Sequence, residues 1–119
     1  MTVPAGESVE AAYDGLVIRT EQDGSAPSPF ELFLASIGTC AGFYVAAFLR
    51  GRNLPTAGLR LRQVVERDEE TGMVQRIAID VEFPPEVPEK YRAAALRAAN
   101  ACAVKKHLEH PPVIEVAAR

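Results

Sequence analysis

The chain has 119 residues, of which 48% are hydrophobic and 24% are charged, a composition typical of soluble globular proteins. Its length predicts one domain over residues 1–119. The net charge of −3 argues against nucleic acid or an anionic membrane as the main partner, because both select basic surfaces.

The start of the chain and its cysteine content bear on the cellular compartment. The first eight residues are polar and lack the apolar run of a secretory signal, so we expect a cytoplasmic protein. Its two cysteines are Cys40 and Cys102, and permanent disulfides are rare in a reducing compartment. Catalysis, redox sensing and simple burial are the interpretations that remain open for them.

The first predicted element is a β-hairpin. Residues 9–12 and 16–20 flank Asp14-Gly15, a dipeptide that favours a tight hairpin turn. Residues 22–27 are rich in Gly, Ser and Pro, which predicts a loop before the next element.

A long helix is predicted over residues 29–50. Ser28 and Glu31 form an S-x-x-E capping box, and Pro29 takes the first helical position. Gly51 supplies a stop signal. Nearly every side chain in between is apolar, so the helix is expected to be buried on all sides.

The same segment is long enough to cross a membrane, which is the alternative interpretation. Its apolar run is interrupted, however, by Glu31, Ser36, Gly38 and Thr39, and the rest of the chain has the pattern of a soluble domain. We therefore expect a core helix covered by a sheet and by a partner subunit, and no association with a membrane.

Two strands are predicted next. Residues 59–67 alternate between apolar and polar side chains. Residues 73–83 alternate more regularly and place Ile77, Ile79 and Val81 on one face. A polar turn separates the two segments, so they are expected to pair as a long hairpin.

The last part of the chain is predicted to be mainly helical. Pro88 opens a second helix, and Asn100 breaks it because Asn is a poor interior residue and a good cap. Cys102 would then lie in the first turn of a short helix over residues 101–108. Residues 113–117 are expected to close the fold as a strand.

This order of elements predicts an α+β fold in which an antiparallel sheet covers a long central helix. A chain of 119 residues has too little sheet to cover that helix on every side. We therefore expect an intimate homodimer in which the two subunits share the cover of their central helices.

The two cysteines lie on separate predicted helices, and packing of these helices would bring the sulfurs together. A reactive thiol needs a cation or a helix N-terminus nearby. Cys102 has a predicted helix N-terminus, with Lys105 and Lys106 one turn further on. Cys40 lies mid-helix and would need a cation such as Arg19 or one from the partner subunit.

Other polar residues have simpler structural roles. Glu31 lies nine residues before Cys40, about 13.5 Å along a straight helix, so helix capping is its simplest function. His107 and His110 lie near Cys102, but four convergent ligands cannot be assembled with a standard metal-site spacing. We expect neither a metal nor a cofactor.

The segment SPFELFLASIGTC, residues 28–40, resembles the motif P-x-E-L-L-L-x-A-L-x-x-C of the OsmC/Ohr family. This family comprises the osmotically inducible and organic-hydroperoxide-resistance proteins. The continuation AGFYVAAFLRGRNL is similar to the family's central helix, and ACAVKKHL is similar to its second cysteine motif. The order of predicted elements agrees over nearly the whole chain.

The resemblance implies an intertwined α+β homodimer with two active sites at the subunit interface. In the family's peroxidases the first cysteine attacks the peroxide as a thiolate and becomes a sulfenic acid, which the second cysteine converts to a disulfide. A dithiol, lipoyl-type in some members, then reduces this disulfide. Carried over, Cys40 would be the peroxidatic residue and Cys102 the resolving residue of an enzyme that reduces organic hydroperoxides in oxidative stress.

Three positions depart from the family's pattern. In the organic-hydroperoxide branch the helper Glu directly follows the Pro, whereas here Phe30 takes that position and Glu31 comes one residue later. The helper Arg of that branch belongs to the first hairpin, whose first strand over residues 9–12 has no Arg here, so Arg19 of the second strand is the candidate. Cys102 is followed by Ala103, where the family often has Pro.

A binding function is the alternative from a different class. The same OsmC-like dimer would hold a hydrophobic small molecule in its interface pocket, with unreactive cysteines. A purely structural homodimer with buried cysteines and no ligand is the third interpretation.

Overall fold

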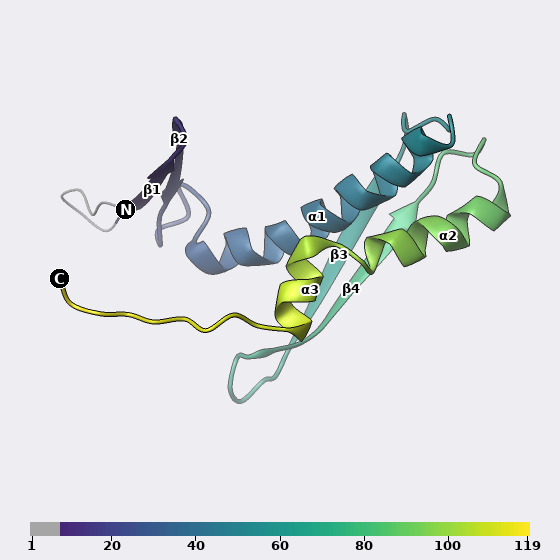
Figure 1. Ribbon diagram of the computed structural model, residues 1–119. Coiled ribbons are helices and arrows are strands. Elements are labelled where there is room, and N and C mark those ends of the chain that lie inside the picture. Colours follow the sequence, from purple (N-terminus) through teal and green to yellow (C-terminus); the bar gives the residue numbers. More distant parts are fainter. Residues whose placement is uncertain (1–7) are drawn as a thin grey trace. The chain divides into compact units, whose positions relative to one another are not determined.

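The computed structural model describes residues 8–119 and has the predicted α+β composition (Figure 1). Over these residues two antiparallel hairpins and three helices follow one another in the order β1-β2-α1-β3-β4-α2-α3. The chain divides into two compact units, Met1–Ser36 and Ile37–Arg119, which we call the first and the second unit. Helix α1 begins in the first unit and continues into the second. The expectation of one domain stays a prediction.

The first hairpin forms as predicted. Strand β1 (Val9–Tyr13) pairs antiparallel with β2 (Leu16–Thr20). The two turn residues both have positive φ angles, 47° at Asp14 and 77° at Gly15. This is the backbone of a type I′ turn, whose twist matches that of the flanking strands.

Helix α1 (Pro29–Gly51) begins with the predicted capping box. The Ser28 Oγ accepts a hydrogen bond from the backbone N–H of Glu31 at 3.1 Å, and Glu31 Oε1 accepts one from the backbone N–H of Ser28 at 3.1 Å. Each side chain thus pairs a backbone donor that a helix start leaves open.

The helix ends differently from the prediction. Gly51 is still helical, and the residue with the left-handed backbone is Asn53, with a φ of 56°. The N–H of Asn53 bonds to the carbonyl of Arg50 at 3.0 Å and that of Leu54 to Leu49 at 2.9 Å. This is a Schellman motif, and Leu54 packs against the core that contains Leu49.

The second hairpin consists of β3 (Arg60–Arg67) and β4 (Val74–Glu82). Its outer face pairs Arg60 with Glu82 and Arg62 with Asp80 across the strands. Opposite charges on facing positions stabilise this register over a slip by one residue. The apolar side chains on the alternate positions face the helices, as the period of two predicts.

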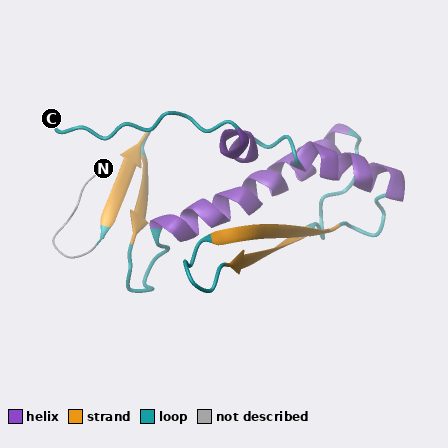
Figure 2. Ribbon diagram, turned by 90° about the horizontal axis from the view of Figure 1, so that it is seen from below, coloured by secondary structure: helices purple, strands orange, loops and turns teal. Residues whose placement is uncertain are grey.

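The core of the second unit lies between this hairpin and two helices. Helix α2 (Glu89–Ala99) lies with α1 on the same side of the β3–β4 hairpin (Figure 2). The buried cluster contains Val45 and Leu49 of α1, Ala95 of α2 and Val87 of the segment before α2. Each buried Val or Leu side chain contributes about 1.5–3 kcal/mol to the stability of such a core.

Glycines let α1 approach strand β3 closely. A Cβ atom at Gly42 would lie 3.6 Å from Leu61 Cδ1, and one at Gly38 would lie 2.7 Å from Gln63 Oε1. Any side chain at Gly38 therefore requires Gln63 to move. The small residues in the middle of α1 are part of how the helix packs on the hairpin.

The buried stripe of α1 covers one side of the helix only. It consists of residues at intervals of four: Ile37, Ala41, Val45 and Leu49. On the opposite side Thr39, Phe43 and Ala47 are exposed, and Phe43 has 73% of its surface accessible. Within one chain α1 is thus buried on one side, and cover of its other side by a partner subunit stays a prediction. By length and composition α1 could cross a membrane, a test that core helices of soluble proteins also pass.

Helix α2 breaks where the sequence predicted. Asn100 is its C-cap, and the short helix α3 (Ala103–Glu109) follows with Cys102 as its N-cap. Cys102 thus lies one residue before the first turn rather than within it.

The predicted final strand is wrong. Residues 111–119 contain neither helix nor strand, and Val113, Ile114 and Val116 are 86%, 82% and 96% exposed. The residue types favour a strand, but within the described chain no neighbouring strand pairs with this segment, and an isolated strand has no partner for its backbone groups.

Replacing Asn53 tests the C-terminal cap of α1. Asn53→Ala is expected to lower the free energy of unfolding by about 1 kcal/mol, because a Cβ without a local hydrogen bond is strained in the left-handed region. Asn53→Gly relieves that strain and is expected to leave the stability unchanged or higher. Urea denaturation of the three proteins measures the differences. Equal stabilities for the Ala and Gly variants would contradict the capping role.

Candidate functional site

A cavity of about 470 Å³ lies within the second unit. Four elements supply its walls: α1, β4, α2 and α3, together with the link between the last two. The lining residues are Ile37, Ala41, Ile77, Ile79, Val81, Leu96, Ala99, Asn100, Cys102, Lys105 and Leu108. The walls are mostly apolar, with three residues that carry polar or nucleophilic groups at the α2–α3 link and in α3. This is the usual composition of a small-molecule site.

Cys102 is held at this cavity by the break between α2 and α3. Its side chain is only 2% exposed, and its Sγ accepts a hydrogen bond from the backbone N–H of Lys105 at 3.4 Å. The sulfur therefore takes the place that a Ser or Asp oxygen usually takes at a helix start.

Cys40 lies on α1 beside the same cavity wall. Ile37 and Ala41, which line the cavity, are three residues before it and one residue after it. At 3.6 residues per turn, Cys40 lies about 60° around the helix from Ile37. Its side chain is half-buried, and both cysteines are free thiols. Cys40 itself is not among the residues that line the cavity, and its meeting with Cys102 stays a prediction.

Lys105 is the charged residue among the described residues that line the cavity. Its Nζ donates a hydrogen bond to Asn100 Oδ1 at 2.6 Å and lies 3.8 Å from Glu109 Oε1. The side chain is 44% exposed, so the ammonium group is at the boundary between the cavity and solvent. Its partner Asn100 also lines the cavity.

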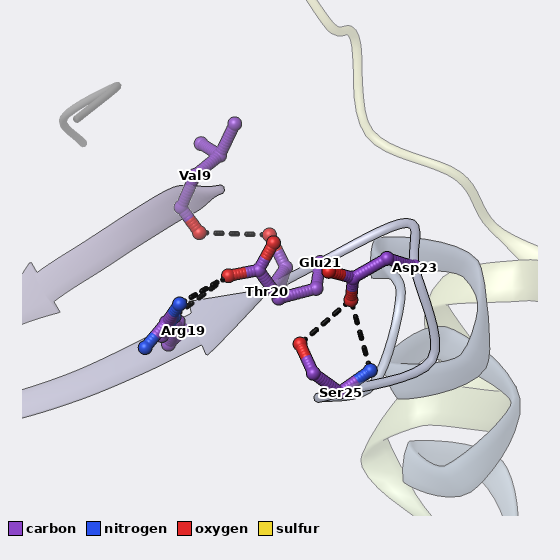
Figure 3. A network of polar contacts seen from close by, with 6 residues as sticks. All are labelled: Val9, Arg19, Thr20, Glu21, Asp23 and Ser25. Atoms are coloured by element: carbon purple, nitrogen blue, oxygen red, sulfur yellow. Dashed lines mark hydrogen bonds and ion pairs between the residues drawn. The ribbon is translucent and has the colours of Figure 1, made fainter. Parts of the chain in front are cut away.

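Arg19, the predicted cation for Cys40, lies in the first unit and pairs with Glu21 there (Figure 3). Its Nε donates to Glu21 Oε1 at 2.8 Å, and its Nη2 contacts the same oxygen. The hydrogen bond and the charge of Glu21 raise the pKa of Arg19 above its ordinary value. Glu21 is 6% exposed and is thus a buried carboxylate with a charged partner. A role for Arg19 at Cys40 stays a prediction.

Glu31 also lies in the first unit, where it forms the capping box. The hydrogen bonds from Ser28 hold the pKa of the Glu31 carboxyl below its ordinary value, since they favour the charged form. Its structural role is observed, whereas a catalytic role stays a prediction. The histidines have local roles: His107 Nδ1 lies 2.6 Å from the carbonyl of Ala103, and no group of three metal-ligating side chains occurs among the described residues.

The family follows from a comparison with known proteins. A family model described as OsmC-like protein matches residues 22–117. The chain belongs to the OsmC-like family. This family match covers the capping box, all of α1, both cysteines and the cavity.

Solved structures with the OsmC-like fold resemble the chain over most of its length. A protein from Psychrobacter arcticus 273-4, whose name refers to osmotic stress induction and a detoxification response, has a TM-score of 0.75 at 20% identity, covering 88% of this chain and 82% of that one. An OsmC-like protein from Mycoplasma pneumoniae has a TM-score of 0.70 at 12% identity, covering 87% and 80%. At these identities the likeness shows the fold. No curated protein matches the chain.

The sequence predicts both cysteines of this OsmC-like chain as candidate site residues, but not the whole cavity. It predicts Asn100 as a helix breaker and Lys105 as a cation one turn from Cys102. Their side chains meet because the helix break turns the chain at this point. The pairing of Glu21 with Arg19 is not predicted, although Glu21 directly follows β2 and a spacing of two residues in extended chain puts both side chains on one side.

The pH dependence of stability tests the role of Glu31. Because its pKa is lowered in the folded protein, the charged carboxylate stabilises the fold above its unfolded pKa, and this contribution is lost as the pH falls through the folded value. In Glu31→Gln the amide oxygen still caps Ser28 but does not titrate in this range. The acid-induced loss of stability below about pH 4.3 is therefore expected to be smaller in this variant than in the wild type.

Thermal melts from pH 7 to pH 3 measure this difference. Glu66→Gln, on the outer face of β3, is the control for loss of a carboxylate elsewhere. Identical pH profiles for wild type and Glu31→Gln would contradict the capping role.

Proposed function

We propose that this OsmC-like chain is a thiol-dependent peroxidase that reduces organic hydroperoxides through Cys40 and Cys102. One observation above all supports the proposal: Cys102 lines an apolar cavity whose α1 wall, Ile37 and Ala41, comes from the same helix as Cys40. An apolar cavity lined by a thiol suits a substrate that carries an organic group on its peroxide. Membership of the OsmC-like family agrees with this reaction.

The proposed reaction has two chemical steps in the protein. The Cys40 thiolate attacks the terminal peroxide oxygen, the O–O bond breaks, and the leaving alkoxide takes a proton to become an alcohol. Cys40 is then a sulfenic acid. The Cys102 sulfur attacks the Cys40 sulfur, a disulfide forms, and the sulfenic oxygen leaves as water after taking up a proton.

A reductant completes the cycle. The Cys40–Cys102 disulfide must accept two electrons, and a dithiol delivers them by two successive exchanges that leave the dithiol as its own disulfide. A dithiol of the lipoyl type suits an apolar cavity because its chain is itself apolar. The reductant is thus proposed as a partner, together with the organic hydroperoxide.

Thiol titration tests the reaction. One equivalent of cumene hydroperoxide is expected to remove both thiols of the wild-type protein, and dithiothreitol is expected to restore them. Cys40→Ser is expected to consume hydroperoxide at the uncatalysed background rate. Unchanged consumption by Cys40→Ser would contradict the proposal.

Cys102→Ser is the matched variant for the second step. Serine is a favoured N-cap, so this change keeps the start of α3 while removing the resolving thiol. The variant is expected to react once and to accumulate a sulfenic acid at Cys40 that dimedone traps. Continued turnover by Cys102→Ser with dithiothreitol and no trapped sulfenic acid would contradict the role of Cys102.

We also propose that the protein is a homodimer whose subunits cover each other's α1. The exposed side of α1, with Thr39, Phe43 and Ala47, is apolar or small, and an exposed apolar helix face is typical of an association surface. A second copy supplies an equivalent face, as in a two-fold symmetric interface.

Light scattering tests the dimer. Phe43→Glu is expected to shift the molar mass from two chains to one, because it buries an unpaired charge in the proposed interface. Met73→Glu is the control, since Met73 is 69% exposed and lies at the β3–β4 turn. A wild-type mass of one chain, or the same mass for both variants, would contradict the proposal.

Small-molecule binding without turnover is the second candidate function. The cavity favours it, because its size is within the range of about 300–1,000 Å³ that small-molecule sites occupy. Retention of both thiols after one equivalent of cumene hydroperoxide would favour this function over the peroxidase.

A further inference from the structure

We propose that the outer face of the β3–β4 hairpin is a self-complementary surface on which a second copy of this chain docks, related to the first by a two-fold axis parallel to the strands. The side chains of this face alternate along β4 with those that line the cavity, so the proposed surface is separate from the candidate site. Docking here requires neither the proposed peroxidase reaction nor the proposed α1 interface.

Charged side chains make up most of the outer face, which lies on the side of the hairpin away from α1 and α2 (Figure 2). It consists of alternate residues of both strands: Arg60, Arg62, Val64 and Glu66 of β3, and Arg76, Ala78, Asp80 and Glu82 of β4. All are exposed except the half-buried Ala78. Three arginines and three carboxylates give the face no net charge, whereas the whole chain has −3. Two copies can therefore approach each other on this face without net repulsion between the faces.

Each charged residue of the outer face lies opposite a residue of the other sign. The register places Arg60 opposite Glu82, Arg62 opposite Asp80, Glu66 opposite Arg76, and Val64 opposite Ala78. Among the residues that the structure describes, none of these charged side chains has an ion pair or a hydrogen bond. Their charges are therefore open to groups that approach the face from outside.

This pattern is self-complementary under one symmetry operation. A two-fold axis that runs parallel to the strands, between two outer faces, places β3 of each copy over β4 of the other. Every charged residue then lies over a residue of opposite sign. Arg62 of each copy, for example, lies over the partner's Asp80. The apolar centre of the face, Val64 and Ala78, meets the same centre of the second copy. The pattern thus favours a second copy of the chain as the occupant.

The outer face is small, so the association is expected to be weak and reversible. The eight residues of β3, at about 3.3 Å per residue, give a face about 26 Å long and two strands wide. Two sheets that pack face to face keep their strands within about 30° of each other, which holds the facing rows together. Exposed ion pairs are weak one by one, but the two-fold axis forms every pair twice and salt screens all of them together. Interfaces of this size belong to the transient class.

Sedimentation velocity of the wild-type chain at two salt concentrations tests the surface. The mass is expected to be higher at about 0.02 M salt than at about 0.5 M salt, because the Debye length falls from about 20 Å to about 4 Å. The association constant is expected to fall by about tenfold or more over this range. At the higher salt only the α1 interface contributes to the mass. A mass that changes with neither salt nor protein concentration would overturn the proposal.

Two charge reversals test the symmetry. Arg62→Glu alone, and Asp80→Arg alone, put like charges over each other in the docked pair and are expected to abolish the salt-sensitive association. An equimolar mixture of the two variants is expected to restore it, because each altered residue then meets the opposite charge on the other copy. Effects confined to one chain cannot produce this recovery. A mixture that does not associate, with both variants folded by circular dichroism, would overturn the two-fold arrangement.

The double variant Arg62→Glu/Asp80→Arg keeps the test decisive if the single reversals fail to fold. It retains opposite charges within its own hairpin, so it is expected to fold as the wild type does. It is expected to associate with itself but not with the wild type, since the mixed pair places like charges over each other. Salt-sensitive energy transfer between fluorescently labelled chains measures both associations. Equal association of the double variant with itself and with the wild type would contradict the proposal.

Arg97→Glu is the matched control. It changes the net charge by the same amount as Arg62→Glu, but Arg97 is an exposed residue of α2 and lies outside the outer face. This variant is expected to associate as the wild type does. Equal losses for Arg62→Glu and Arg97→Glu would show that net charge governs the association and would overturn the proposal. Neither arginine lines the cavity, so the peroxidase can fail in the thiol titration while the docking surface stands, and the reverse.

Discussion

The second unit depends on the packing of the buried stripe of α1 against the β3–β4 hairpin and α2. Val45 and Leu49 at one end of the stripe have no exposed surface and close the core. Ile37 and Ala41 at the other end face the cavity. The C-terminal half of α1 is therefore packed in the core, and the residues nearer its middle line the cavity. The same spacing of four residues serves both parts.

The polar end of the cavity arises from the break between α2 and α3. Had the helix continued through Asn100, the residues that follow would have moved on along its axis, away from the α1 wall. The break instead puts Asn100, Cys102 and Lys105 at one side of an apolar space. The interruption of the helix thus brings a thiol, an amide and an ammonium group to one side of the cavity.

The parts of the fold that could be predicted are those that depend on a few neighbouring residues. The Asp14-Gly15 turn and the Ser28–Glu31 box each depend on a few neighbouring residues, and both formed as expected. The end of α1 differs from the prediction because Gly51 fits the last turn of a helix as well as a cap. The left-handed cap residue is Asn53 instead, which lets Leu54 reach the core. Residues 113–117 have the composition of a strand, but a strand requires a partner that composition does not reveal.

The candidate site could be predicted only in part for a similar reason. Separate helices for Cys40 and Cys102 followed from periodicity. The Lys105–Asn100 contact depends on how the chain turns between α2 and α3, and a one-residue change in that turn would point the ammonium group elsewhere. The exposure of one side of α1 could not be predicted either, because the order of helices and strands does not reveal which side of the helix the rest of the chain covers.

The sulfur at the start of α3 couples covalent chemistry to backbone order. The Sγ of Cys102 accepts the Lys105 N–H, so any bond formed at this sulfur is made at the atom that caps α3. Helix α3 has seven residues, none of them buried, and is too short to persist without its first-turn anchor. The cap at this one sulfur is therefore also what begins the helix that carries Lys105 and Leu108, two lining residues of the cavity.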